Sequence, residues 1–136
     1  MDRHLIEEKL ETLRKCVARI EGKRPASAKA LAGDPDLQDI IALNLTRAVQ
    51  LSVDIAAHII ADTSASAPET MAQAFDTLAN LKVIAPELAG RMKKAVGFRN
   101  IAVHSYQSID WEIVHNICHR NLGDFKLFAQ AIATAL

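Results

Sequence analysis

The chain has 136 residues, half of them hydrophobic and few of them aromatic, and its 16 basic and 16 acidic residues balance. This length and composition predict a single domain over residues 1–136, with a substantial core built from helices packed on helices. The neutral charge excludes the strong overall field that many nucleic-acid-binding proteins carry.

Hydrophobic spacing predicts helices along almost the whole first half of the chain. The first helix covers residues 2–21, and Gly22 follows as a stop signal. Residues 23–32 are polar and alanine-rich, which predicts a connection. Asp34 followed by a proline is typical of a helix cap and a first helical residue, and predicts a long helix over Pro35–Ala61.

The second half continues the helical pattern. Residues 62–68 are predicted as a loop, and a shorter helix should follow over residues 69–81. Pro86 opens another helix, and capping residues at 108–110 precede a last helix that ends near Leu136. No alternating strand pattern appears. The sequence therefore predicts an all-α, up-and-down bundle of four long helices and one short helix.

The chain contains no hydrophobic run clean enough to predict a membrane span. The best candidate, residues 39–60, is interrupted by polar and charged side chains, namely Asn44, Arg47, Gln50 and Asp54. Cys16 and Cys118 are far apart and form no C-x-x-C pair, and no signal-peptide pattern is present. We interpret both cysteines as small buried residues of a reduced, cytoplasmic protein.

The segment from Phe98 to Tyr106 places Arg99, Asn100, His104 and Tyr106 within an otherwise aliphatic chain. A histidine can accept or donate a proton near neutral pH, and an arginine offers a fork of donors that matches phosphate oxygens. Together they suit cleavage of an RNA phosphodiester without a metal. Asn100 could hold the imidazole in one tautomer or orient the substrate.

Helix geometry tests this hypothesis. On a continuous helix Arg99 and His104 point about 140° apart, whereas Asn100 and His104 share a face. Either the helix breaks near His104, or the site is assembled from two copies of the chain. We favour the dimer.

Other polar residues are weaker candidates. The basic side chains at Arg91, Lys93 and Lys94 are candidate RNA contacts, although a solvated helix face is the favoured interpretation. The polar positions of the long helix form either a second wall of the site, with Arg47 on phosphate, or a solvent face; they are Asn44, Arg47, Gln50, Asp54 and His58.

A metal site is not predicted. His115 and His119 lie four residues apart, with Glu112 one turn earlier, and this geometry can bind zinc. No further ligand is evident, so we predict neither a metal nor another cofactor.

The string Gly97 to Tyr106, followed by Ile109 and Asp110, resembles the signature of HEPN domains, and of HepT-like toxins in particular. Residues 39–50 and 75–81 also resemble helices of that family, so the resemblance covers nearly the whole chain. It implies an all-α homodimer that acts as a metal-independent endoribonuclease. It also implies the toxin role in a type VII-like toxin–antitoxin pair with an MntA-like nucleotidyltransferase.

The resemblance also implies a role for each residue of the motif. Arg99 and His104 would carry cleavage, Asn100 would support them, and Tyr106 would receive AMP from the antitoxin. AMP would add negative charge and bulk beside the cleavage residues. Two alternatives remain open: a non-catalytic HEPN module that docks a minimal nucleotidyltransferase, and a helical dimer whose polar seam only fixes subunit register.

Overall fold

Helices provide the regular structure of residues 2–136, the part of the chain that the computed structural model describes, and no strand forms among them. The all-α prediction is confirmed. In chain order the elements are α1 (Arg3–Lys23), α2 (Ala28–Ala32), α3 (Pro35–Ala61), α4 (Met71–Asn80), α5 (Pro86–His104), the 3-10 helix η1 (Tyr106–Ser108), α6 (Trp111–Asn116), the π-helical segment η2 (Ile117–Asn121) and α7 (Leu122–Ala135).

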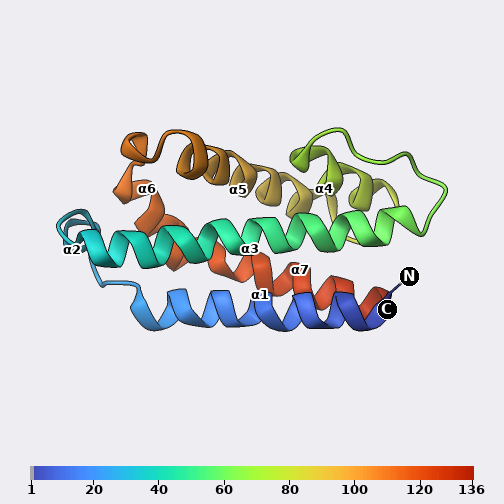
Figure 1. The fold of residues 1–136 in the computed structure, drawn as a ribbon, viewed down its shortest axis with the longest axis horizontal. Coiled ribbons are helices and arrows are strands. Elements are labelled where there is room, and N and C mark those ends of the chain that lie inside the picture. The colour runs from blue at the N-terminus through green and yellow to red at the C-terminus, as the bar shows by residue number, and fades with distance from the viewer. Residues whose placement is uncertain (1) are drawn as a thin grey trace.

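The long helices run up and down along one axis (Figure 1). Helix α1 packs antiparallel against α3, and α4 and α5 pack on the opposite side of α3. Helix α7 returns along α1, so both chain ends lie at the same end of the bundle. The predicted bundle topology is confirmed, and it leaves the turn after α5 at the opposite end from the termini.

The long central helix begins and ends where the sequence predicts. Asp34 caps α3 because its carboxylate accepts the N–H of Leu37 at 3.1 Å, and Pro35 occupies the first helical position. Asp110 likewise caps α6 by accepting the N–H of Glu112 at 3.0 Å. These side-chain caps therefore fix the positions at which α3 and α6 begin.

Three sequence predictions about local structure are wrong. Gly22 does not end α1, which continues to Lys23, because an exposed helix tolerates the roughly 1 kcal/mol that glycine costs there. The predicted connection at 23–32 contains the short helix α2, capped by Ser27. The last helix is divided by η2, where hydrogen bonding widens to a π-helical pattern.

Hydrophobic side chains from every long helix form one core. Phe75 of α4 and Phe128 of α7 meet edge to face at its centre, with ring centroids 5.8 Å apart. By length and composition alone α3 would be long and apolar enough to cross a membrane, contrary to the sequence interpretation. However, 50% of that stretch is buried inside the fold. We therefore interpret α3 as a core helix of the bundle.

Candidate functional site

Helix α5 carries Arg99 and His104 on one unbroken stretch and ends at the histidine. Ser105 leaves the helix with φ −149° and ψ 54°, while its N–H still donates to the carbonyl of Ile101 at 2.8 Å. The predicted break near His104 is confirmed, but it follows the histidine. Because Arg99 and His104 leave the same helix about 140° apart, the break does not bring them to one face.

Arg99 is half-buried and extends from α5 towards α3. Its Nη2 donates to Gln50 Oε1 at 3.4 Å, and its Nη1 donates to Asn100 Oδ1 at 3.2 Å. Gln50 is itself held, because its Nε2 donates to Asp54 at 3.0 Å. Both acceptors of the guanidinium are neutral amides, and Nε is buried without a hydrogen-bond partner. These contacts orient the guanidinium and leave its positive charge available to an anion.

His104 and Asn100 occupy the outer side of the same helical turn. Both residues are exposed, and they lie four positions apart on α5. The imidazole of His104 is therefore accessible to a large substrate, as a general acid or base must be. The sequence prediction that Asn100 shares a face with His104 agrees with the helix, although Asn100 also accepts a hydrogen bond from Arg99.

Tyr106 lies in η1, just beyond the end of α5, and its hydroxyl donates to Asp39 Oδ1 of α3 at 2.5 Å. Its ring packs edge-on against Trp111, with centroids 5.9 Å apart. The phenol is 39% exposed. Partial burial, together with the hydrogen bond to Asp39 and the negative charge of that carboxylate, raises the pKa of Tyr106 to about 12. Sequence reasoning missed Asp39, since 67 positions separate the partners.

The polar residues of α3 divide between the candidate site and other surfaces. Gln50 meets Arg99, as the hypothesis of a second wall requires. Asn44 is buried and donates to the carbonyl of Ile40 in its own helix at 2.8 Å. Arg47 is exposed on the α1 side, where its charge lowers the pKa of Cys16 against the larger, raising effect of burial. Only part of the set therefore belongs to the Arg99 surface.

Two of the basic candidates on α5 are paired with carboxylates from other helices. Arg91 Nε lies 2.8 Å from Asp124, and Lys93 Nζ lies 3.2 Å from Asp76. Lys94 is exposed and lines the groove described below. In the folded chain, carboxylates from other helices therefore neutralise two of the three basic charges of this segment.

The two histidines lie one in α6 and one in η2, with ring centroids 4.4 Å apart. His119 Nε2 lies 2.8 Å from the carbonyl oxygen of Pro25, whereas His115 Nε2 is buried without a hydrogen-bond partner. Within residues 2–136 no group of three or more His, Cys, Asp or Glu side chains could hold a metal ion. Both cysteines are free and buried, as predicted, and burial raises the pKa of Cys118 to about 11.

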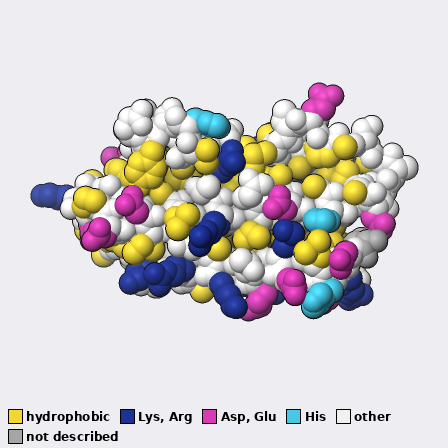
Figure 2. Space-filling view, viewed as in Figure 1, with side chains coloured by type: hydrophobic (Ala, Val, Ile, Leu, Met, Phe, Trp, Pro, Cys, Tyr) yellow, Lys and Arg dark blue, Asp and Glu magenta, His cyan; other side chains and the backbone are white. Residues whose placement is uncertain are grey.

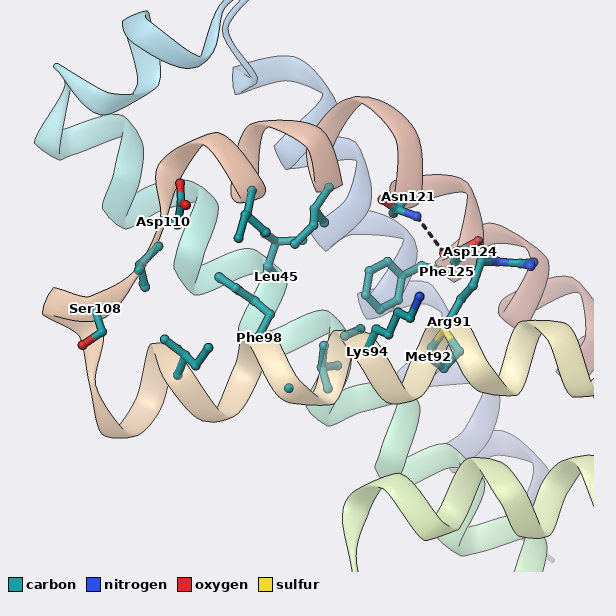
Figure 3. A pocket seen from close by; sticks show the side chains of 17 residues that line it. Leu45, Arg91, Met92, Lys94, Phe98, Ser108, Asp110, Asn121, Asp124 and Phe125 are labelled. Atoms are coloured by element: carbon teal, nitrogen blue, oxygen red, sulfur yellow. Dashed lines mark hydrogen bonds and ion pairs between the residues drawn. The ribbon is translucent and has the colours of Figure 1, made fainter.

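A groove of about 560 Å³ lies between α5 and the segment that runs from α6 through η2 into α7 (Figure 3). Its walls are largely hydrophobic, with Phe98 and Phe125 facing the cavity and Asp110 and Asp124 towards opposite ends. Arg99 and His104 do not line it. The groove is therefore a hydrophobic surface beside the candidate site.

Hydrophobic side chains are also exposed around the end of α5. Ile101 and Val103 are 46% and 48% exposed, and Ile113 of α6 is 57% exposed. In Figure 2 hydrophobic side chains gather on the upper half of the face, over α3 to α5, while most charged side chains lie lower, along α1. Clusters of this kind are typical of protein interaction surfaces.

The helical bundle and the motif on α5 are those of a HEPN-type domain, and similarity to known proteins identifies the family. Residues 6–132 match the family described as Ribonuclease HepT-like. The chain therefore belongs to the HepT-like family, as the resemblance predicted.

Three individual relatives are similar to this chain over nearly their whole length. The mRNA nuclease HepT of Shewanella oneidensis is 34% identical over 128 residues, which cover 94% of this chain and 96% of that protein. A solved tri-AMPylated HEPN toxin of Shewanella oneidensis in complex with its MNT antitoxin superposes with a TM-score of 0.90 at 34% identity, covering 98% of this chain and 99% of that one. A toxin–antitoxin complex with AMP-PNP gives a TM-score of 0.91 at 32% identity, covering 97% and 99%.

Proposed function

We propose that this protein is the toxin of a toxin–antitoxin pair, a metal-independent endoribonuclease that uses Arg99 and His104 and is neutralised by AMP transfer to Tyr106. The observation that carries the proposal is the end of α5. There, neutral amides orient the Arg99 guanidinium, and His104 is exposed on the same helix. The relatives named as mRNA and tRNA nucleases support the substrate class.

The working site is assembled from two copies of this single-domain chain. Within one copy, Arg99 and His104 diverge by about 140° on an unbroken helix. In a two-fold dimer the arginine of one α5 can face the histidine of the other. The exposed Ile101, Val103 and Ile113 supply hydrophobic surface for this contact.

The cleavage step uses the chemistry of these two side chains. His104 accepts the proton of an RNA 2′-hydroxyl while that oxygen attacks the neighbouring phosphorus. The bond from phosphorus to the 5′-oxygen breaks, and a protonated imidazole supplies the proton that the leaving oxygen needs. Arg99 stabilises the charge that accumulates on the phosphoryl oxygens, and Asn100 supports the pair. The products are a 2′,3′-cyclic phosphate and a 5′-hydroxyl end.

Neutralisation follows from the position of Tyr106, two residues after His104. AMP on its hydroxyl places a phosphate and an adenosine beside the residues that would bind the RNA phosphate. The partner is an MntA-like nucleotidyltransferase, in keeping with the antitoxins bound to the structural relatives. Since RNA and ATP are the substrates of the pair, we place the protein in the cytoplasm.

A cleavage assay in the presence of a chelator tests the function. The wild-type dimer should cut RNA in EDTA, and His104→Ala should lower the rate by about 10²–10⁴-fold with an unchanged melting temperature. His4→Ala, at an exposed position on α1, is the matched control and should keep full activity. Cleavage that persists in His104→Ala contradicts the mechanism. A wild-type dimer that binds the nucleotidyltransferase and never cuts RNA supports the non-catalytic alternative.

A further inference from the structure

The acceptor of the Tyr106 hydroxyl is a carboxylate of the same chain. Tyr106 donates to Asp39 Oδ1 at 2.5 Å, so the proton that must leave during AMP transfer already points at a base. The edge contact with Trp111 fixes the ring from another side. Asp39 itself is exposed on the first turns of α3. The pair therefore lies where a nucleotidyltransferase can reach it.

We propose that Asp39 is a catalytic residue of the modification reaction, the general base that the toxin supplies for AMP transfer to its own Tyr106. This inference rests on the proposed neutralisation of the toxin at Tyr106. It differs from that proposal because it assigns part of the transfer chemistry to the substrate protein instead of to the antitoxin.

The transfer step balances with ATP as the second substrate. The Tyr106 oxygen forms a bond to the α-phosphorus, the bond from that phosphorus to the bridging oxygen of the β-phosphate breaks, and pyrophosphate leaves. The hydroxyl proton passes to Asp39. Kinases use an aspartate in this way, to accept the proton of a hydroxyl that stays protonated until it attacks a phosphoryl group.

The electrostatics of the contact favour a base of this kind over a free phenolate. Asp39 is the charged group that acts on the phenol, and its negative charge disfavours loss of the proton before the attack. A hydroxyl held as a neutral donor therefore needs its acceptor during the transfer. Asp36, one turn earlier on α3, is also exposed and acidic, but its side chain makes no hydrogen bond or ion pair in the described part of the chain.

The test measures AMP transfer from radiolabelled ATP by the cognate nucleotidyltransferase to variants of the full-length toxin. Asp39→Asn keeps an oxygen that can accept the Tyr106 hydrogen bond and removes the base. It should slow labelling by about 10²-fold. Asp36→Asn is the matched control and should be labelled at the wild-type rate. Asp39→Glu should recover a large part of the rate.

The pH profile separates a base from a residue that only positions the tyrosine. The ratio of wild-type to Asp39→Asn rates should fall as the pH rises from 6 to 9, because hydroxide replaces the missing base. Equal rates for the two proteins, or a slow variant whose ratio to wild type is constant with pH, overturn the proposal. If wild-type toxin is not labelled, or if Tyr106→Phe is labelled as well, the proposed neutralisation at Tyr106 fails instead.

Discussion

A mixed dimer provides the sharpest test of the two-chain site. Two variants are needed: Arg99→Ala, which keeps its histidine, and His104→Ala, which keeps its arginine. In a composite site the arginine comes from one chain and the histidine from the other. A dimer of one chain of each variant then contains one intact site and one site that lacks both groups. Neither homodimer contains an intact site.

The expected activity follows from the helix. Between Arg99 and His104, α5 turns by about 140° and rises by about 7.5 Å, so one chain cannot aim both side chains at one phosphate. A purified mixed dimer should retain about half of the wild-type rate, and an unseparated equal mixture about a quarter. Each homodimer should be slower than wild type by about 10²-fold or more.

Co-expression with two different affinity tags yields the mixed dimer, and cleavage of a labelled RNA in EDTA measures its rate. A mixed dimer of two wild-type chains that carry the same tags is the control. A mixed variant dimer that is as inactive as either homodimer refutes the reasoning, because each site would then need both groups from one chain.

Three further measurements test other contacts. Tyr106 is the only tyrosine, so an absorbance titration should give a midpoint at its pKa of about 12 in the folded protein and near 10 after denaturation. Because folding raises this pKa, the contribution of the phenol to stability is complete below about pH 10 and is lost as the pH rises through about 12; equal midpoints contradict the contact. Phe128→Ala should lower the free energy of unfolding by about 3–5 kcal/mol in urea, and a loss below about 1 kcal/mol is inconsistent with a packed ring. Gln50→Ala should lower the cleavage kcat about tenfold by loosening Arg99, with Gln130→Ala on α7 as a control that keeps the wild-type kcat.

Most of the fold could be predicted because its signals are local. Asp34 and the proline after it define the start of α3 through one side-chain hydrogen bond and one fixed φ angle. The failures have equally physical reasons. Helix α2 is too short to show a hydrophobic period, and the glycine at position 22 costs less than the flanking helical turns stabilise.

For the candidate site, the sequence predicted the local motif but not the contacts that its residues make with other helices. The motif, which begins on α5 and ends in η1, was enough to propose Arg99, His104 and Tyr106 as candidates from the sequence alone. Their contacts with α3, to Gln50 and Asp39, join positions separated by 49 and 67 residues, and a single sequence contains no signal for such pairs. The same limit explains why the basic segment looked unpaired, since its carboxylate partners come from other helices.

The edge-on contact between Tyr106 and Trp111 gives the molecule a built-in optical reporter. The chain has one tryptophan and one tyrosine, and their ring centroids lie 5.9 Å apart. An adenylyl group on the phenol would change the surroundings of the indole directly. If AMP is added at Tyr106 as proposed, the tryptophan emission of the toxin should change on modification, and within this chain that emission comes from position 111 alone.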